Sequence, residues 1–235
     1  MTTPVFPPLF TGCDRTGQGD PMDHACRQAR DGCDAGLVVY DLGDDRLRAA
    51  IVFAPEEALR DAVVALPVCG VGFQNALGAL APPEVAVHLE WGGGIRINGA
   101  TCGRLRMAAA DKRPDAPVDW LVVGLDLRLW PQSGDTGLTP DETALYAEGC
   151  ADVTPVALLE AWVRHTLVGI NIWLDSGAGS VHRDWSALAH DLDQAAAAQG
   201  QSGRVVGIDE RLGLLLQQGE KTTLIPLTDL LEETT

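Results

Sequence analysis

The sequence predicts a mixed α/β fold of the α+β kind, in which helices flank a largely antiparallel sheet and a small β-domain follows. Strand patterns joined by short turns predict the sheet. Apolar residues at helical spacing over residues 155–175 predict a long flanking helix. The polar break at residues 199–203 marks a boundary. We therefore expect a main domain over residues 1–198 and a C-terminal β-domain over residues 199–235.

The N-terminal part predicts a loop, a helix and a hairpin. Repeated proline and glycine over residues 1–19 favour an extended or loop entry. Asp20 can cap a helix that has Pro21 at its first position and ends at Gly32. The polar turn after Leu42 then joins two predicted strands, over residues 35–40 and 47–53.

The remaining elements follow from the same signals. Helical patterns cover residues 56–66, 73–80, 155–175 and 182–198. Strand patterns cover residues 85–91, 95–97, 101–107 and 120–127, and further short ones lie around 204–208, 213–217 and 222–226. Asn98-Gly99 predicts a two-residue hairpin turn.

Charge excludes two classes of partner. The net charge is −16, which repels nucleic acid and anionic membrane surfaces. The N-terminus has neither a basic segment nor an apolar signal segment, and no apolar run approaches the roughly 20 residues of a membrane span. We expect a soluble, cytoplasmic protein.

The cysteines and histidines predict no metal site. The six cysteines include no CxxC pair. His165, His182 and His190 are too widely spaced for a shared metal on one helical face. We expect reduced thiols that mostly fill the core.

Four segments, in this order, resemble a known family. They are residues 90–105 (EWGGGIRINGATCGRL), residues 122–127 (VVGLDL), residues 175–185, and residues 204–209 (RVVGID) followed by residues 213–216 (GLLL). Their order is similar to the catalytic domain of biotin and lipoate protein ligases with its small C-terminal domain. The resemblance covers nearly the whole chain, and it implies a class II synthetase-like main domain and an SH3-like C-terminal domain.

The resemblance implies a chemistry. The family joins biotin, lipoate or a related acyl group to ATP, and then passes the acyl group to a lysine on a biotinyl or lipoyl carrier domain. Negative charge develops around a phosphate in both steps, so the site needs fixed donors and Mg²⁺. ATP with Mg²⁺, biotin or lipoate, a carrier domain and a homodimer are therefore what the resemblance suggests.

This sequence departs from the family at the chemical groups. Trp91 is kept, but the Pro-Asn-Asp that follows it in the family is replaced by Gly92-Gly93-Gly94. Ala100 stands where the adenylate-forming lysine is expected, counted back from Gly103. Only residues 41–48 occupy the place of the Arg/Gly-rich loop. Asp126 or Leu125 stands where the family has an asparagine after the Val-Val-Gly strand. The Ser-Thr-Asn that begins the family's first helix is replaced by Asp20-Pro21-Met22-Asp23.

The candidate pocket lies where the kept positions converge over the sheet. We expect it to include Trp91, Gly92, Gly93, Gly94, Gly103, Arg104, Gly124 and Asp126. Strand alternation puts Thr101, Gly103 and Leu105 on one face and Cys102, Arg104 and Arg106 on the other. If the second set lines the pocket, Arg104 contacts the anionic group of a ligand. If the first set does, Arg48 is the better candidate.

Three functions stay open. The first is a ligase-like protein that binds a small carboxylic acid or an acyl-carrier partner, with its ligase activity lost or relocated. The second is an ATP-independent acyl transferase with Cys102 as nucleophile and a basic partner such as His88. The third is a non-catalytic interaction protein whose acidic surface docks a basic partner. The glycines Gly92–Gly94 either cradle an anion with their amides or simply form a wide turn.

Overall fold

The computed structural model describes residues 3–131, 139–198 and 200–233. Within these residues, seven strands form the main sheet in the order β1-β2-β3-β7-β6-β5-β4. β1 runs parallel to β2, and the other neighbouring pairs are antiparallel. The strands are β1 (Thr11–Asp14), β2 (Leu37–Leu42), β3 (Arg46–Phe53), β4 (Val87–Leu89), β5 (Gly94–Ile97), β6 (Ala100–Ala109) and β7 (Leu121–Arg128). The predicted, largely antiparallel sheet is confirmed.

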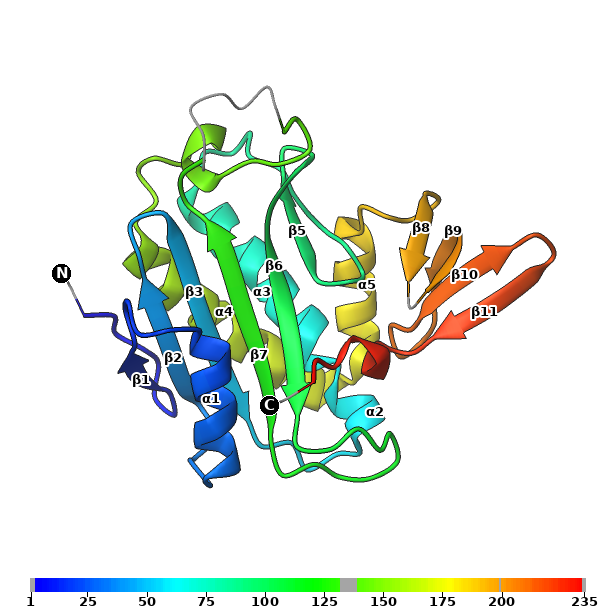
Figure 1. The fold of residues 1–235 in the computed structure, drawn as a ribbon, viewed down its shortest axis with the longest axis horizontal. Helices are drawn as coiled ribbons and strands as arrows, with labels where there is room; N and C mark the ends of the chain where they lie inside the picture. Colours follow the sequence, from blue (N-terminus) through cyan, green and yellow to red (C-terminus); the bar gives the residue numbers. More distant parts are fainter. Residues whose placement is uncertain (1–2, 132–138, 199, 234–235) are drawn as a thin grey trace.

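Helices cover both faces of this sheet (Figure 1). α3 (Ala65–Leu80) and α4 (Pro155–Ser176) pack against each other on one face, with α5 (Ala178–Leu188) beside them. α1 (Pro21–Arg30) lies on the opposite face, across β2, β3 and β7. Shorter helical elements are α2 (Leu59–Ala62) and the 3-10 helices η2 (Leu145–Glu148) and η3 (Leu227–Leu230).

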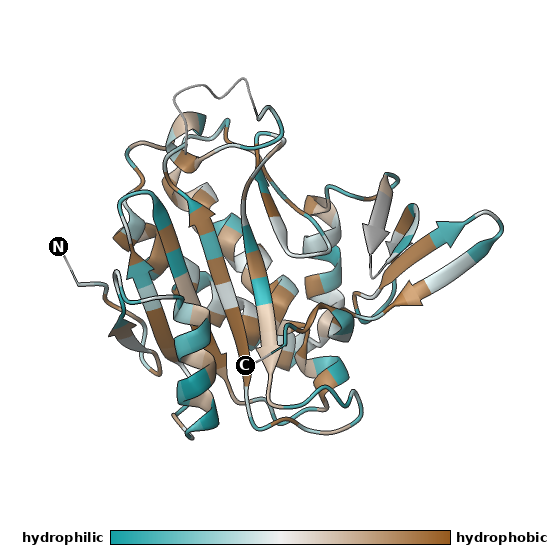
Figure 2. Cartoon of the chain, viewed as in Figure 1, coloured by the Kyte–Doolittle hydropathy of each residue, from teal (hydrophilic) through white to brown (hydrophobic). Residues whose placement is uncertain are grey.

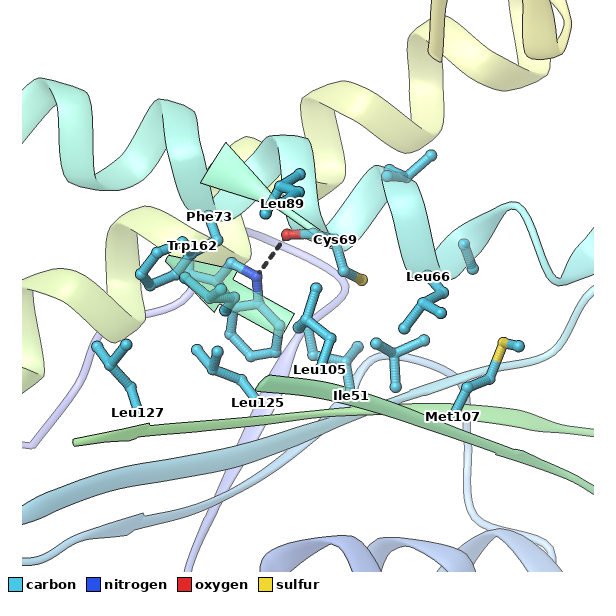
Figure 3. Close-up of a cluster of buried hydrophobic side chains, with 14 of the residues drawn as sticks. Ile51, Leu66, Cys69, Phe73, Leu89, Leu105, Met107, Leu125, Leu127 and Trp162 are labelled. Carbon is cyan, nitrogen blue, oxygen red and sulfur yellow. Dashed lines mark hydrogen bonds between the residues drawn. The ribbon is translucent and has the colours of Figure 1, made fainter. Parts of the chain in front are cut away.

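The main core lies between the sheet and the pair α3 and α4. Strand alternation directs Ile51, Leu105 and Leu125 towards these helices (Figure 3). Trp162 of α4 is fully buried among them, and its indole N–H donates a 3.0 Å hydrogen bond to the carbonyl oxygen of Cys69 on α3. This bond satisfies the one polar atom of a large apolar side chain, so Trp162 links the two helices directly.

A second, smaller core lies beneath α1. Val39, Ala50 and Val122 come from three neighbouring strands and pack with Met22 of α1. A side-chain carbon at Gly124 would meet the sulfur of Met22 at 2.9 Å, so α1 rests directly on the backbone of β7. The glycine therefore allows this close approach.

The predicted start of α1 is confirmed. A carboxylate oxygen of Asp20 accepts a 2.9 Å hydrogen bond from the backbone N–H of Met22, and Pro21 opens the helix. The helix ends at Arg30, and Gly32 follows with a φ of +88°. The left-handed conformation at Gly32 is one that favours glycine, which explains the stop.

One helical stretch has the length and apolarity of a membrane span. Within Leu59–Leu80, an 18-residue window reaches a mean hydropathy of 1.6, although no apolar run of membrane-spanning length was expected from the sequence. However, 67% of that window is buried inside the fold. A core helix has the same composition, and α3 lies between the sheet and α4.

Other element predictions need correction. The helix expected over residues 182–198 ends at Leu188, and Ala195–Ala198 form strand β8 instead, because pairing with β9 overrides the helix propensity of alanine. The helices expected over residues 56–66 and 73–80 are the short α2 and a long α3, in which Pro67 sits in the first turn. β1, expected as loop, pairs with β2.

The C-terminal residues form a small sheet, as predicted. Its antiparallel order is β11-β10-β9-β8, and β8 precedes the expected boundary at residue 199. Val205, Leu214 and Leu216 of this sheet belong to the main core cluster. The small sheet is thus packed onto the main domain. Its strands are β8 (Ala195–Ala198), β9 (Gln201–Ile208), β10 (Leu214–Gln218) and β11 (Lys221–Ile225).

Candidate functional site

The candidate site is the part of the sheet face that α1 leaves open. α1 begins at Pro21, above the strand row that contains Gly124. Under α1, the residues of β2, β3, β6 and β7 that point towards this helix are apolar. Beyond the row of Gly124, the positions on the same face of these strands are charged, and the strands become more hydrophilic there (Figure 2). No helix among the described residues covers these positions, so all of them except the buried Asp41 can carry charge at least partly exposed to water. These positions are Asp41, Arg46, Arg48, Arg104, Arg106, Asp126 and Arg128.

Four of these charges form one row across the sheet. Asp41 lies opposite Arg48, Arg48 opposite Asp126, and Asp126 opposite Arg104, after which Gly94 ends the row. Side chains directly opposite each other have Cβ atoms about 5 Å apart. The row therefore alternates in sign from β2 to β6, and each charge has an opposite neighbour.

Most of the arginines on this face form ion pairs. Arg48 pairs with the buried carboxylate of Asp41, and Arg46 pairs with Asp126 at 3.0 Å. Arg106 donates a 2.6 Å bond to the second carboxylate oxygen of Asp20, so the residue that caps α1 also holds β6. These pairs fix the floor of the site.

Arg104 differs from the other arginines. Its side chain is exposed, and in the part of the chain that the structure describes it has no ion pair or hydrogen-bond partner. Arg128, the last residue of β7, is paired with Glu142 at 2.9 Å. Arg104 is therefore the guanidinium on this face that can meet a ligand without first losing a protein partner.

A hollow of about 440 Å³ lies at the end of the charged row. Three arginines, two acids, one threonine and three glycines line it: Arg46, Arg104, Arg128, Glu90, Asp126, Thr101, Gly92, Gly94 and Gly103. No apolar side chain is among them. The hollow brings together Gly92, Gly94, Gly103, Arg104 and Asp126 of the predicted site.

The open face keeps buried polar atoms without described partners. The Oδ1 atom of Asp126, which lines the hollow, and the Nε atoms of Arg48 and Arg106, which do not, have no hydrogen-bond partner among the described atoms. Such atoms typically cost about 1–3 kcal/mol each when they stay unsatisfied. The ion pairs of the face therefore leave some of its polar atoms unsatisfied.

Four predicted site residues do not line the hollow: Trp91, Gly93, Arg48 and Gly124. The indole of Trp91 is buried and turned away from the hollow, with its N–H donating a 2.8 Å bond to the carbonyl of Leu212 in the small β-domain. Gly124 lies beneath Met22 of α1. Arg48 is on the open face, but its pair with Asp41 directs it along the row and it does not line the hollow. Trp91 and Gly124 therefore do not converge with Arg104 as predicted, because the small domain and α1 cover them.

The glycine turn is used mainly for its shape. Gly93 has a φ of +91°, and a side-chain carbon there would meet the carbonyl oxygen of Leu105 at 2.3 Å. Its N–H donates to the carbonyl of Glu90 at 2.9 Å, so this amide is not free for an anion. The side chain of Glu90 lies over Gly94. Gly92 has open space around it. Binding of an anion by backbone amides of this turn therefore stays a prediction, for Gly92 alone.

Strict alternation along β6 is also corrected. The pairing of β5 with β6 shifts register after Ile95, which leaves Cys102 as an extra residue. This bulge turns Cys102 into the core while Arg104 stays on the open face. The expected grouping of Cys102 with Arg104 on one face is therefore wrong.

Three residues of the hollow were missed from the sequence: Arg128, Glu90 and Thr101. A signal for Arg128 existed, because Asp126 and Arg128 are spaced by two within one strand, as Arg46 and Arg48 are in another. Charges at that spacing in strands that are otherwise apolar indicate one exposed patch on a buried sheet.

Comparisons with known proteins agree with this architecture. The model of the biotin/lipoate A/B protein ligase family matches residues 6–187, and that of a domain of unknown function, DUF4444, matches residues 193–233. The chain belongs to the biotin/lipoate A/B protein ligase family. A biotin protein ligase-like protein of unknown function from Silicibacter sp. TM1040 is similar in structure, with a TM-score of 0.93 and 59% identity over 98% of this chain and 100% of that one.

More distant structures share the fold. A mutant biotin protein ligase from Aquifex aeolicus in complex with biotin has a TM-score of 0.73 at 14% identity, over 93% of this chain and 96% of that one. A Leishmania major biotin protein ligase in complex with biotinyl-5-AMP has a TM-score of 0.60 at 15% identity, over 94% and 98%. The comparison with curated proteins gives no match.

In this member of the ligase family, the described residues offer few free groups to Mg²⁺ and ATP. They contain no group of three or more His, Cys, Asp or Glu side chains that could hold a metal ion. The two acids of the hollow are already paired, Asp126 with Arg46 and Glu90 with Arg96. Leu42 lies opposite Leu47 in the β2–β3 hairpin, so its turn is too short for a loop that closes over a nucleotide.

Cys102 of this ligase-family chain does not have the environment of a nucleophile. It is fully buried, and burial raises the pKa of its thiol to about 12. Its sulfur lies 3.5 Å from the carbonyl oxygen of Arg128. His88, the expected basic partner, instead contacts the ring of His190 with 6.0 Å between ring centroids. The thiolate needed for acyl transfer is therefore strongly disfavoured.

We predict that Cys102 resists alkylation in the folded protein. Iodoacetamide near neutral pH should label the half-buried Cys13 and Cys33 first, and Cys102 only when the chain unfolds, because alkylation requires an accessible thiolate. Peptide mass spectrometry over a time course measures this. Labelling of native Cys102 as fast as that of Cys33 would contradict the prediction.

Proposed function

We propose that this ligase-family protein binds a small carboxylic acid on the open face of its sheet, through Arg104, and does not activate that acid with ATP. One observation carries the proposal: a guanidinium without a described partner points into a hollow of about 440 Å³, in a chain whose net charge is −16. The other arginines of this face are paired with acids, so Arg104 is the one among the described residues of this face that leaves its positive charge open to an anion.

The neighbours of Arg104 support this role. A guanidinium can donate two parallel hydrogen bonds to one carboxylate, which sets both affinity and orientation. Arg46 and Arg128 line the same hollow and add positive potential, while their pairs with Asp126 and Glu142 hold them in place. The acid would thus enter a preformed site, and few side chains would lose freedom on binding.

ATP-dependent activation is the part of the family chemistry that we propose is absent. Ala100 stands at the lysine position, at the start of β6 beside the Asn98-Gly99 turn, and it offers no charge to a phosphate. The related structures from Aquifex aeolicus and Leishmania major contain biotin or biotinyl-5-AMP. Biotin and ATP are therefore the first probes for this chain.

Other functions rank below this one. The burial of Cys102 argues against a thiol-dependent transferase. A carrier domain, a second copy of the chain and a basic protein partner remain candidate partners of a chain that we expect in the cytoplasm. Binding of such a partner without any small acid would favour the interaction protein.

Calorimetric titration of the full chain tests the proposal. Biotin, lipoate and short carboxylic acids are titrated with and without ATP and Mg²⁺ into the wild-type protein and into Arg104→Gln. Arg164→Gln is the matched control, since Arg164 is exposed on α4, on the other side of the sheet. We expect at least one acid to bind with an affinity that ATP leaves unchanged and that falls at least about tenfold in Arg104→Gln alone.

Two outcomes oppose the proposal. An acid whose binding requires ATP and Mg²⁺ would show that an adenylate site persists. An acid that binds equally well to both variants would place its site elsewhere on the molecule.

A further inference from the structure

We propose that the acid bound at Arg104 is hydrophilic, with hydroxyl or amino groups beside its carboxylate, and that the hollow rejects the apolar acyl chains that the family attaches. This inference rests on the proposed function and names its substrate class. It comes from the lining of the hollow, which is polar, whereas a fatty or ring-bearing acid requires apolar surface.

The lining of the hollow offers an alkyl chain no apolar surface. Small-molecule pockets are usually lined mostly by apolar and aromatic side chains. Here the side chains are guanidinium, carboxylate and hydroxyl groups, between glycine backbone. An alkyl chain gains affinity by leaving water for apolar surface, so it gains little in this hollow. A chain rich in hydroxyl groups exchanges hydrogen bonds with water for hydrogen bonds with these groups.

The apolar region next to the hollow is closed. Behind the glycine turn, Trp91, Leu89 and Leu105 line a cavity of about 20 Å³. That volume holds about one water molecule and no acyl chain. An apolar tail therefore cannot run from Arg104 through the turn into the core.

A second apolar pocket, larger than this cavity, lies in a different place. It has about 410 Å³ and is lined by Phe53, Ile170 and Trp173, among others. Phe53 is the last residue of β3, whereas Arg46 is the first, and α4 lies across the sheet from the open face. An acid held at Arg104 cannot place its tail there, so any binding in that pocket will not depend on Arg104.

The polar groups beside Arg104 match donors and acceptors on such a ligand. Asp126 lies directly opposite Arg104, and its partly exposed carboxylate lines the hollow. Thr101 contributes a hydroxyl on the same side of the hollow, without a described hydrogen-bond partner for its side chain. A carboxylate at Arg104 would place neighbouring hydroxyl or amino groups within reach of both residues.

Gluconate and hexanoate form a matched pair of probes, because they share a six-carbon carboxylate skeleton and differ in their hydroxyl groups. Both are titrated by calorimetry into the full-length wild-type protein and three variants, Arg104→Gln, Thr101→Val and the control Arg164→Gln. Thr101→Val keeps the branched shape that suits a strand and removes only the hydroxyl. Denaturant unfolding confirms that each variant is folded.

We expect gluconate to bind the wild-type protein and hexanoate not to bind. Gluconate affinity should fall at least about tenfold in Arg104→Gln, about fivefold in Thr101→Val and not in Arg164→Gln, as expected for loss of a charged and of a neutral hydrogen bond.

Each other outcome overturns the hydrophilic ligand alone, or both this ligand and the acid site at Arg104. Hexanoate that binds as well as gluconate, and is lost in Arg104→Gln, would refute the hydrophilic ligand but keep the acid site. Binding of either acid that ignores Arg104→Gln would refute both claims, as would the failure of both acids to bind up to their solubility limits.

Discussion

Replacing Trp162 with alanine is expected to destabilise the fold by about 3–5 kcal/mol, the range for a fully buried aromatic residue. The side chain is 0% exposed and bridges α3 and α4. Its loss leaves a cavity against the sheet and also leaves the carbonyl of Cys69 without its donor. Because small domains have about 5–15 kcal/mol of total stability, this one change removes a large part of it.

Denaturant unfolding of Trp162→Ala measures this effect. Trp130→Ala is the matched control, because Trp130 is 54% exposed and only stacks edge-to-face on Tyr146. The control should change the free energy of unfolding by less than about 1 kcal/mol. Equal effects of the two variants would mean that Trp162 is not the link between the two helices.

Trp91→Ala is the second large change, with an expected loss of about 3–5 kcal/mol for the same reason. Trp91 is 5% exposed and its N–H bonds to Leu212 of the small β-domain. Its backbone N–H donates to Asp191 at 2.9 Å, in the segment that leads into that domain. The variant should therefore also loosen the small sheet, seen as faster hydrogen exchange in β9 and β10.

Trp91→Phe separates this structural role from a role in binding. Phenylalanine keeps most of the packing and loses the hydrogen bond, so the loss of stability should be smaller and affinity for the acid should stay near the wild-type value. If Trp91→Phe abolished acid binding while its unfolding remained normal, Trp91 would belong to the ligand site after all.

The sequence was sufficient for most of the fold. Periodicity and turn chemistry identified all strands except β1 and β8, together with the cap at Asp20 and the helix α4, because each of these depends on neighbouring residues. β8 was missed because four alanines carry no strand signal of their own. Their conformation depends on β9, which is a partner that local patterns do not contain.

The site was predictable only in part. Gly103, Arg104 and Asp126, which were proposed as neighbours in one site, line the same hollow. Trp91 and Gly124 do not, because the small domain and α1 cover them. The bulge at Cys102 could not be inferred either, since it depends on how β5 pairs with β6. Which side chains reach a pocket is decided by packing across the sheet, and not by spacing along one strand.

The most direct test is the exchange of labelled pyrophosphate into ATP, measured with biotin, lipoate, octanoate and gluconate in turn. Acyl-adenylate formation is reversible and releases pyrophosphate, so a protein that activates an acid incorporates the label only when that acid is present. Because the family resemblance places Ala100 where the lysine is expected, we predict no acid-dependent exchange, while gluconate still binds through Arg104. Acid-dependent exchange with any of the four acids would contradict the account and establish a working adenylate site.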